Sequence, residues 1–426
     1  MRTLIAELKA TDGGKRKVSV CGWVHRIRDL GKVCFVLLRD RTGQVQLVLD
    51  RKPEFSVESV LRVTGSVAAN AKAPGGLEIQ VRELEVLSAA APDLPLPVNQ
   101  DPARLSLEAV LDHRMISLRN PKILSVFRLQ SAILKFFAAH MRNEGFTEVK
   151  TSKLIGTGTE GGTGLFAVEY FDTQVYLAQS PQFYKQAMIA SGLERVFEIG
   201  AAYRAEKHET PRHLNEYVSL DVEMAFIESE QELMDLEVRI LKSIFAGLAA
   251  ENRAELEVWE ADVPAPDDVE RIPRLSHEEA REIAAARAGR RVYEINPEAE
   301  RLLCEWAREE HGIDAVFVTA FPRKKRPFYT HPLENRYTRS FDLLFRGLEI
   351  TTGGQRINDY AMLLESASRF GLEADSLRDY LDIFKYGCPP HGGFAIGLER
   401  LTQKILGLDN VKEASLFPRD RRRIRP

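Results

Sequence analysis

The sequence predicts an α+β protein with two domains, a small N-terminal β-barrel and a larger domain built on an antiparallel β-sheet with flanking helices. Three observations predict this arrangement. Apolar and polar residues alternate in short runs through 17–88, and a stretch rich in Pro and Ala follows at 89–105. From residue 121 onward, helical spacing and further strand-like runs take over.

The N-terminal domain is expected to be a closed barrel of the OB-fold type. Five strand-like runs within about 70 residues are typical of this small barrel. Turn signals separate them, among them "RTG" at 41–43 and "APGG" at 73–76. The runs are 17–29, 32–40, 43–50, 61–69 and 77–88. We assign the barrel domain to residues 1–90 and a linker or hinge to 91–112.

The second domain, residues 113–426, is expected to combine a long helix with an antiparallel sheet. The helix covers 121–145, with Pro121 at its start and Gly145 at its end. Strand-like runs follow at 146–155, 175–180, 195–204 and 217–227, and they resume at 315–322, 340–351 and 392–400. Between them, about 228–314 forms a helical insertion, in which Ser229 with Glu232 and Ser276 with Glu279 have capping-box spacing.

Composition excludes several classes of protein. The chain has 426 residues, 28% of them charged, and a net charge of −3, so any nucleic-acid contact must come from local basic patches. The four cysteines are scattered without CxxC spacing, which argues against a zinc site or a disulfide framework and favours a reducing cytoplasm. We expect no signal peptide and no membrane span.

Charged residues at the ends of apolar strand-like runs point to an anionic ligand. Arg204 ends one such run, Glu349 and Arg356 lie in a second, and Arg400 ends a third, with paired glycines nearby. The sequence contains no GxxxxGK[ST] phosphate loop. Bound phosphates must therefore be held by arginines, whose guanidinium groups stay charged and bind oxyanions in a bidentate manner.

These segments resemble a known family. "FEIGAAYRAEKHETPRHLNEYVSLDVEM" (197–224) is similar to motif 2 of the class II aminoacyl-tRNA synthetases, and "GGFAIGLERLTQKILG" (392–407) is similar to motif 3. "VYLAQSPQFYKQ" (175–186), "TEGG" (159–162) and "RPFYT" (326–330) narrow the resemblance to aspartyl-tRNA synthetases of the short, archaeal-like type. The resemblance extends from "GWVHRIRDLG" to the terminal "FPRDRRRIRP" and implies an ATP-dependent, AMP-forming aspartate–tRNA ligase.

The resemblance assigns an ATP site. Arg204 corresponds to the arginine that holds the α-phosphate, Arg400 to the arginine on the γ-phosphate side, and Tyr217 to the ring that stacks on adenine. Glu349 and Thr352 correspond to the pair that coordinates Mg²⁺, a cation that prefers hard oxygen ligands. Thr352 stands where serine is familiar but keeps the hydroxyl. The remaining residues implied at the ATP site are Glu206, His213 and Leu214.

The resemblance also assigns an aspartate site. Lys185 and Arg356 correspond to the cations that bind the substrate's side-chain carboxylate. Asparagine is nearly isosteric but neutral and would leave a desolvated cation poorly paired, which can cost ~10⁴-fold or more in selectivity. Glu160, Gln182 and Asp221 correspond to positions around the α-ammonium group, and Thr352 completes the implied set.

The barrel is implied to read the anticodon. Phe35 is expected to stack on an unpaired base, with Arg28 and Gln46 beside it. His25, expected in a loop after "GWV", and Pro74 stand where strictly aspartate-specific relatives tend to carry tryptophan and lysine. We therefore expect charging of both tRNA(Asp) and tRNA(Asn), and a functional link to a tRNA-dependent amidotransferase. A homodimer is also expected, although Ser152 replaces the usual motif 1 proline.

Three other functions remain open from the sequence. An asparaginyl-tRNA synthetase is the nearest, and Lys185 together with "RPFYT" argues against it. An ammonia-dependent asparagine synthetase with the same catalytic fold would not need the barrel. A non-catalytic OB-type RNA-binding protein would be expected to have lost Arg204, Glu349 or Arg400, and all three are present.

Overall fold

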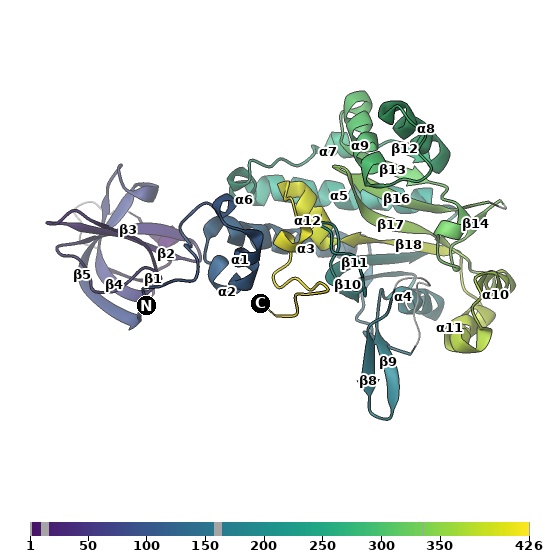
Figure 1. Ribbon diagram of the computed structural model, residues 1–426, viewed down its shortest axis with the longest axis horizontal. Helices are drawn as coiled ribbons and strands as arrows, with labels where there is room; N and C mark the ends of the chain where they lie inside the picture. Colours follow the sequence, from purple (N-terminus) through teal and green to yellow (C-terminus); the bar gives the residue numbers. More distant parts are fainter. Residues whose placement is uncertain (1, 10–16, 157–163, 335, 426) are drawn as a thin grey trace. The chain divides into compact units, whose positions relative to one another are not determined.

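The computed structural model describes residues 2–9, 17–156, 164–334 and 336–425. The chain divides into two compact units, Met1–Asn120 and Pro121–Pro426 (Figure 1). The first contains the barrel, and the second contains a large sheet with helices. Both architectures agree with the fold class expected from the sequence.

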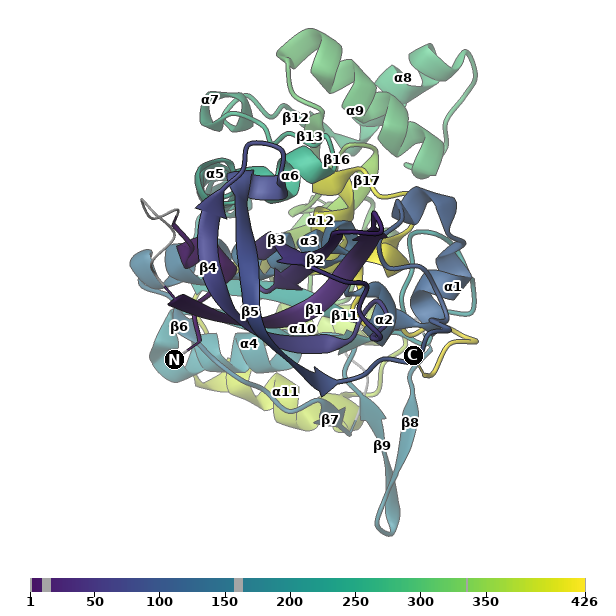
Figure 2. The same cartoon turned by 90° about the vertical axis from the view of Figure 1, so that its left-hand side faces the viewer.

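The barrel is closed and has the strand order β1-β2-β3-β5-β4 (Figure 2). Alternate residues such as Val36 and Leu38 are fully buried inside it, whereas Phe35 and Leu37 between them are only half-buried. The period of two in the sequence therefore separates the inside from the outside, as expected. The strands are β1 (Lys17–Asp29), β2 (Cys34–Asp40), β3 (Gly43–Leu49), β4 (Val60–Ala69) and β5 (Leu77–Ser88).

The chain after the barrel is largely irregular and packs within the same unit. Leu96 and Val98 are buried, and the Asn120 side chain donates hydrogen bonds to the carbonyls of Val98 and Gln100. Two short helices follow, α1 (Leu107–Asp112) and α2 (Arg114–Ser117), after the 3₁₀ turn η3 (Pro102–Arg104). The buried hydrogen bonds give this Pro-rich stretch a defined path rather than leaving it as a free tether.

The second unit is built on an eight-stranded sheet with the order β12-β13-β16-β17-β18-β11-β10-β6. Its central pairs are antiparallel, and the pairs at the two edges, β12 with β13 and β10 with β6, are parallel. The strands are β6 (Thr147–Glu148), β10 (Arg195–Tyr203), β11 (Glu216–Ala225), β12 (Arg274–Ser276), β13 (Ala315–Thr319), β16 (Ser340–Phe345), β17 (Leu348–Arg356) and β18 (His391–Gly397).

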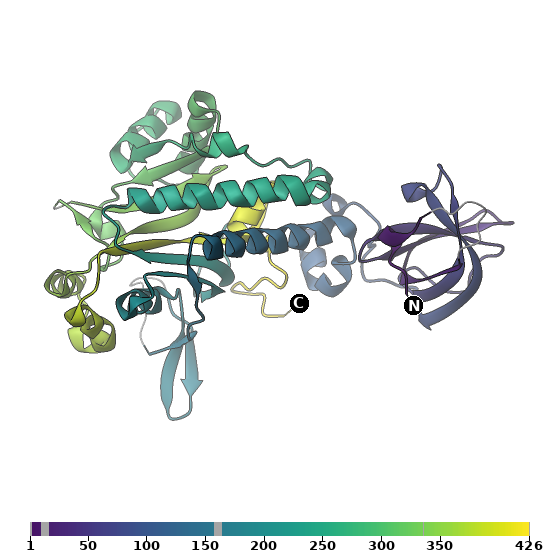
Figure 3. The ribbon, with the colours of Figure 1, turned by 180° about the vertical axis from the view of Figure 1, so that it is seen from behind.

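Two long helices, α3 (Pro121–Asn143) and α5 (Gln231–Glu251), cover one face of this sheet (Figure 3). Their apolar stripes join the inward residues of β10, β11 and β18 in the main core. By length and composition alone α3 would qualify as a membrane span, but Leu129, Ile133, Phe137 and Met141 are fully buried in that core. The expected helix at 121–145 is confirmed, and Gly145 follows it with φ +80°.

The expected helical segment at 228–314 divides into two parts. Its first helix, α5, belongs to the main core, whereas α8 (His277–Ala288) and α9 (Pro297–His311) form a smaller core against β13. The capping box of Ser276 with Glu279 is present at the start of α8. The side chains of Ser229 and Glu232 accept hydrogen bonds from neighbouring backbone amides, and α5 begins at Gln231. The other helices here are α6 (Arg253–Val258) and α7 (Pro266–Val269).

The run at 146–155 forms no continuous strand, contrary to expectation. It provides only β6 and the short β7 (Leu154–Ile155), which joins the hairpin of β8 (Ala167–Tyr170) and β9 (Thr173–Leu177) in a separate sheet. The break falls where Thr151 and Lys153 bind the buried carboxylate of Glu198 in β10. Side-chain contacts replace the strand ladder there. Ser152, at the expected proline position, binds the backbone of Leu154 instead.

The remaining elements of the second unit pack around the large sheet. They are α4 (Gln182–Met188), β14 (Pro332–Leu333), β15 (Tyr337–Thr338), α10 (Tyr360–Arg369), α11 (Arg378–Asp382) and α12 (Leu398–Leu406). α4, α10 and α11 share an aromatic cluster in which Phe183 stacks on Tyr380 with ring centroids 3.9 Å apart. This cluster fixes α4 close to the sheet.

We predict that Glu237 makes the protein less stable at alkaline pH. This α5 carboxyl is fully buried, and burial raises its pKa to about 8. The unfolded carboxyl ionises near its ordinary pKa, so its contribution to stability is lost as pH rises from about 4.5 to 8. Glu237→Gln should remove this loss. In urea unfolding, the advantage of the variant should grow by up to about 5 kcal/mol across that window.

The control for this prediction is Glu257→Gln, because the Glu257 side chain is 64% exposed. It should leave the pH dependence of unfolding unchanged. An equal pH dependence in the parent and in Glu237→Gln would contradict the prediction.

Candidate active site

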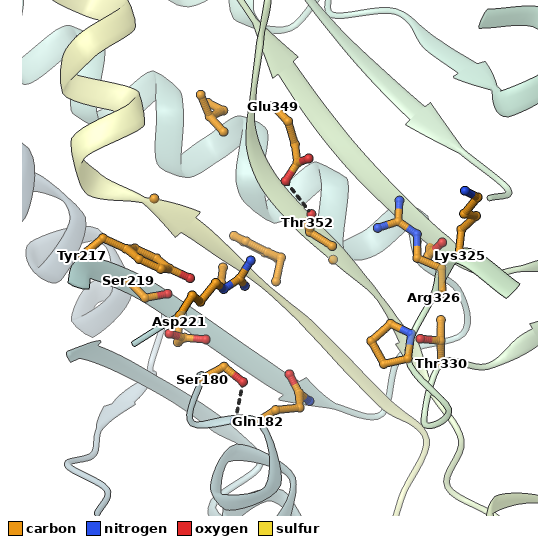
Figure 4. A pocket seen from close by; sticks show the side chains of 18 of the residues that line it. Ser180, Gln182, Tyr217, Ser219, Asp221, Lys325, Arg326, Thr330, Glu349 and Thr352 are labelled. Carbon is orange, nitrogen blue, oxygen red and sulfur yellow. Dashed lines mark hydrogen bonds between the residues drawn. The ribbon is translucent and has the colours of Figure 1, made fainter. Parts of the chain in front are cut away.

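The face of the sheet away from α3 and α5 carries a polar cavity of about 830 Å³. Residues of β11, β17 and β18 form its floor (Figure 4). Along β11, Tyr217, Ser219 and Asp221 alternate with residues that point into the apolar core, so one strand serves both the cavity and the core. The cavity therefore lies where the alternation turns polar side chains away from the helices.

Register across the sheet brings distant segments into one row. Asp221 in β11 lies opposite Ala395 in β18, which lies opposite Thr352 in β17, which lies opposite Asp342 in β16. Directly opposed residues in an antiparallel sheet project to the same face. Asp221, Thr352 and Asp342 therefore share the face of the cavity, although 131 positions separate the first and second in the sequence.

A β-bulge in β17 places Glu349 on this face. Thr351 pairs with Leu343 and Glu349 pairs with Leu344, so Ile350 is the extra residue between them. In a regular strand, Glu349 and Thr352 would point to opposite faces because they are three positions apart. The bulge reverses this, and the Thr352 hydroxyl donates a hydrogen bond of 3.0 Å to Glu349 Oε1 (Figure 4).

A cluster of four buried charges lies at the floor of the cavity. Lys185 Nζ is 3.0 Å from Asp221 Oδ1 and 3.3 Å from Glu223 Oε2. Arg356 Nε is 3.0 Å from Glu223 Oε1, and Nη2 donates to the carbonyl of Gly393 at 2.9 Å. All four side chains are at most 8% exposed. Desolvation opposes ionisation of Glu223, but Arg356 and Lys185 outweigh it and lower its pKa.

The cluster leaves part of Arg356 available to a ligand. Gln182 Oε1 accepts from Nη2 at 3.2 Å, whereas Nη1 makes no hydrogen bond to any residue that the structure describes. Arg356, Lys185 and Asp221 all line the cavity. A small ligand there would meet two cations and one carboxylate, a set that matches an amino acid with two carboxylates and one ammonium group.

Gly393 makes room for the cluster. A Cβ at this position would lie 2.0 Å from the Val222 carbonyl and 2.2 Å from Glu223 Oε2, closer than any real side chain could approach. The glycine pair Gly392–Gly393 thus lets β18 approach the buried carboxylate of β11 closely. The paired glycines noted in the sequence have this steric function.

A loop of residues 204–215 connects β10 to β11 and borders the cavity. Its ends are joined by hydrogen bonds from the Arg204 amide to the Asn215 carbonyl and from the Asn215 side chain to the Arg204 carbonyl. The Arg204 guanidinium lies 5.6 Å from the centre of the Tyr217 ring, and both line the cavity. Glu206, His213 and Leu214 line it too. Burial, with help from Arg400, lowers the pKa of His213, which keeps its imidazole neutral.

Glu349 lies between Arg400 and a second carboxylate, that of Asp342. Arg400, in the first turn of α12, donates to the Glu349 carbonyl at 2.9 Å, and its Nη1 is 3.5 Å from Glu349 Oε1. Asp342 pairs with Arg326 at 2.8 Å. Burial raises the pKa of Asp342 to about 6 despite Arg326, and the charge of Glu349 adds to this shift. Burial also opposes ionisation of Glu349, but Arg400 and other neighbouring cations outweigh it and lower its pKa.

This oxygen-rich corner has the donors that a hard divalent cation prefers. Glu349, Thr352 and Asp342 contribute carboxylate and hydroxyl oxygens, and the buried Asp342 Oδ1 has no hydrogen-bond partner in the described part of the chain. Among all the residues that the structure describes, no group of three or more His, Cys, Asp or Glu has metal-binding geometry. A cation here would need further oxygens from a bound ligand such as a phosphate.

The structure brings together most of the residues expected at the two substrate sites. The exception is Glu160, which lies outside the part of the chain that the structure describes. All others, from Gln182 and Lys185 on α4 to Arg400 on α12, line the one cavity. Sequence reasoning missed Glu223, Arg326, Asp342 and Glu399. Glu223 and Asp342 are charges inside apolar strand-like runs, the same signal that identified Glu349, so they could have been found.

Three of the residues expected to read an anticodon share the outer face of the barrel. Arg28 in β1 lies opposite Phe35 in β2, and Gln46 in β3 lies opposite Leu37, the next outward residue after Phe35. Gln46 also donates to Glu78 at 3.1 Å. Pro74 is exposed in the 3₁₀ turn η2 (Pro74–Gly76), which precedes β5 as expected.

The expectation that His25 lies in a loop is wrong. His25 belongs to β1 at a register shift between Val24 and Arg26, and it is only 8% exposed. Its Nδ1 lies 3.2 Å from Arg39 Nη1, and Arg39 is paired bidentately with the buried Glu58. Burial lowers the pKa of His25, with Arg39 contributing. His25 is the extra residue of this bulge, and it is buried against the Arg39–Glu58 pair.

Comparison with known proteins gives the family. Residues 106–421 match the family model described as "tRNA synthetases class II (D, K and N)", and residues 18–87 match the one described as "OB-fold nucleic acid binding domain". The chain belongs to the class II aminoacyl-tRNA synthetases. The family resemblance inferred from motifs 2 and 3 is thereby confirmed.

Relatives within the class II synthetases cover the whole chain. A protein of Thermus thermophilus named aspartate–tRNA(Asp/Asn) ligase is 49% identical over 100% of both chains. One of the same name from Deinococcus radiodurans is 48% identical over 100% of this chain and 99% of the relative. A protein of Pyrococcus abyssi named aspartate–tRNA(Asp) ligase is 41% identical over 96% of this chain and 96% of the relative.

Solved structures of class II synthetases share the fold. The asparaginyl-tRNA synthetase of Pyrococcus horikoshii complexed with asparaginyl-adenylate superposes with a TM-score of 0.92 at 31% identity and covers 100% of both chains. A putative aspartyl-tRNA synthetase from Leishmania major Friedlin gives 0.90 at 28% identity over 100% of this chain and 95% of that chain. Enzymes of both names have this fold, so the fold alone does not separate the two amino acids.

We predict that the carboxylate of Glu223 is essential for stability of the synthetase domain. Glu223→Ala would leave Lys185 and Arg356 buried with less compensating charge, and breaking such a buried pair costs about 3–5 kcal/mol. Urea unfolding of the full chain should show this loss in the transition of the catalytic domain.

A surface pair supplies the control for Glu223→Ala. Arg62 and Glu85 pair at 2.6 Å with side chains 50% and 59% exposed, so Glu85→Ala should cost less than about 1 kcal/mol. Similar costs for the two variants would contradict a dominant role for the buried cluster.

Proposed function

We propose that this chain is an aspartate–tRNA ligase that activates L-aspartate with ATP and transfers it to the 3′ end of tRNA(Asp), and also of tRNA(Asn). The observation that carries the proposal is the pair of buried cations at the cavity floor, Lys185 and Arg356, next to the carboxylate of Asp221. The names of the bacterial relatives, aspartate–tRNA(Asp/Asn) ligase, support the same substrates.

The cavity floor fits aspartate better than asparagine. Arg356 Nη1 and Lys185 Nζ would bind the side-chain carboxylate of the substrate, while Asp221 and Gln182 would face its α-ammonium group. Glu160 and Thr352 complete the proposed aspartate site. A neutral carboxamide would leave the two cations with less compensating charge in a dry environment, which is costly. Asparaginyl-tRNA synthetase activity is therefore the second candidate, despite the similarity in fold.

Arg204 and Arg400 form the proposed ATP site together with Tyr217, which would stack on adenine. Arg204 would hold the α-phosphate and Arg400 the γ-phosphate, with Glu206, His213 and Leu214 as further contacts. Mg²⁺, held by Glu349 and Thr352, would neutralise charge on the ATP phosphates when bound.

The reaction needs no covalent nucleophile from the protein. A carboxylate oxygen of aspartate attacks the α-phosphorus of ATP, and the bond to the bridging oxygen breaks, so that pyrophosphate leaves. A terminal hydroxyl of tRNA then attacks the aspartyl-adenylate, and AMP leaves. Lys185 and Arg356 orient the amino acid, while Arg204 stabilises the charge that develops at the α-phosphate.

The barrel would bind the anticodon through the outer face that carries Arg28, Phe35 and Gln46. The third anticodon base would be read near Pro74, which offers no side-chain donor. His25 is buried, so we propose that it contributes through the shape of the β1 bulge. A loosely contacted third base would allow charging of tRNA(Asn), and the aspartyl-tRNA(Asn) formed would then require a tRNA-dependent amidotransferase. We further propose a cytoplasmic homodimer.

Pyrophosphate exchange tests the amino-acid specificity. The parent should exchange pyrophosphate with ATP when aspartate is present and far less when asparagine is present. Arg204→Ala and Arg400→Ala should each reduce the aspartate-dependent rate by at least about 10²-fold, because removing one group that stabilises developing charge costs ~2.7–4 kcal/mol.

An exposed arginine on α6 provides the control for these two variants. Arg253 has a side chain that is 82% exposed, and Arg253→Ala should leave the rate unchanged. Exchange that depends on asparagine rather than aspartate in the parent would reject the proposal.

A comparison of purified tRNA(Asp) and tRNA(Asn) tests the second tRNA. We predict that the parent charges both with kcat/KM values within about 10-fold, equivalent to ~1.4 kcal/mol. Pro74→Lys should increase the preference for tRNA(Asp), because it adds a donor at an exposed position without disturbing the barrel core. A preference of a hundredfold or more in the parent would contradict dual charging.

Stacking on Phe35 should account for much of the anticodon affinity. Phe35→Ala in the full chain is predicted to weaken binding of an anticodon stem-loop by about 1–3 kcal/mol, the usual contribution of one stacked base. Leu37→Ala, at the adjacent outward position, controls for a general loss of apolar surface. Equal effects of the two substitutions would argue against stacking by Phe35.

A further inference from the structure

The C-terminal basic segment, Arg419–Arg425, has a charge unlike that of the rest of the chain. Its seven residues contain five arginines and one aspartate, whereas the whole chain has a net charge of −3. Arg421, Arg422 and Arg425 are exposed. From the sequence alone, such a run of charges would be interpreted as a solvated tail. Whether the run can bind a ligand depends on where the structure places it.

The basic segment is attached to the loop of residues 204–215. The Asn215 amide donates to the Arg419 carbonyl at 2.8 Å, and Glu216 forms a β-bridge with Arg419. Arg422 Nε also lies 3.4 Å from Glu209 on the same loop. Figure 3 shows the segment, in yellow, beside β10 and β11. The segment therefore borders the loop that lines the cavity.

A mostly buried ion pair fixes the shape of this segment. Lys412 Nζ lies 2.6 Å from Asp420 Oδ2, and the two side chains are 12% and 8% exposed. Asp420 Oδ1 accepts hydrogen bonds from the amides of Arg422 and Arg423 at 2.8 and 2.9 Å. These contacts close a turn, and they position the following arginines with less loss of conformational entropy on binding than a free tail would incur.

Two arginines of the C-terminal basic segment have no partner, among the described residues, that would compete with a ligand. Arg421 and Arg425 make no hydrogen bond or ion pair to any of the residues that the structure describes. Among the described residues, the Arg422 side chain has only the 3.4 Å contact with Glu209, and it is 83% exposed. An exposed guanidinium of this kind binds phosphate well because its donors match the oxyanion geometry.

We propose that the C-terminal basic segment binds backbone phosphates at the acceptor end of tRNA. This inference rests on the proposed function, because transfer requires the tRNA 3′ end to enter the cavity next to the loop. Leu214 lines that cavity, and the adjacent Asn215 contacts Arg419. Arg419 is thus held next to the cavity wall, and the arginines that follow it lie where the phosphates behind the entering 3′ end would pass.

The test uses the full chain with Arg421→Ala and Arg425→Ala combined. Two lost phosphate contacts should raise KM for tRNA about 10-fold and reduce the slope of log K against log[salt] by ~1.4–1.8. ATP–pyrophosphate exchange without tRNA should stay at the parent rate. The matched variant Arg421→Lys with Arg425→Lys keeps both charges and should recover most of the affinity.

Two exposed arginines elsewhere provide the charge control. Arg253→Ala combined with Arg378→Ala removes the same charge from α6 and α11, where the side chains are 82% and 76% exposed. This variant should keep the parent values of KM for tRNA and of the salt slope. Equal changes in the two double-alanine variants would show a general effect of net charge and overturn the proposal.

Isolated RNA pieces distinguish the acceptor end from the anticodon. Arg421→Ala with Arg425→Ala should weaken binding of an acceptor-stem minihelix and leave binding of an anticodon stem-loop unchanged. Unchanged minihelix binding would overturn the proposal and show that the segment is a solvated tail. Loss of pyrophosphate exchange in this variant would instead show that the two arginines support the structure of the loop of residues 204–215, and it would overturn the proposal. Absence of exchange in the parent would reject the proposed function itself, which is a separate result.

Discussion

The buried cluster of Lys185, Asp221, Glu223 and Arg356 is the constraint on which the site depends. Two cations and two carboxylates can be buried together only if they lie within hydrogen-bonding distance of one another. This requirement fixes α4 against β11 and aligns β17 with β18, since each contributes to the cluster or lies against it. The proposed amino-acid site is thus preorganised by the same ion pairs that join the elements.

The two faces of the sheet have different roles. The face that packs on α3 and α5 is apolar and provides the stability of the domain, whereas the other face carries charges that a folded protein would ordinarily avoid burying. Asp342 illustrates the cost, because burial raises its pKa to about 6 even though Arg326 and Thr352 act to lower it. Bound phosphates and a cation would find these charges already in place, so little reorganisation is needed on binding.

The cavity and the C-terminal basic segment meet at the loop of residues 204–215. Its inner residues line the cavity, and its outer residues contact the segment after α12 through Glu209 and Asn215. The chain thereby places a basic surface beside the cavity. Such local placement is how a protein with a net charge of −3 can bind a polyanion.

The sequence by itself determined the barrel strands, the helix α3 and the order of the family motifs. These are local properties, because alternation with period two and helical spacing are written into consecutive residues. It also identified the main charged residues, since a charge in an apolar run is visible without coordinates. Only the tertiary structure decided which of them meet: the bulge at Ile350 turns Glu349 toward Thr352, strand register joins Asp221 to that row, and the bulge in β1 buries His25. These outcomes depend on pairing between distant strands, which no local pattern specifies.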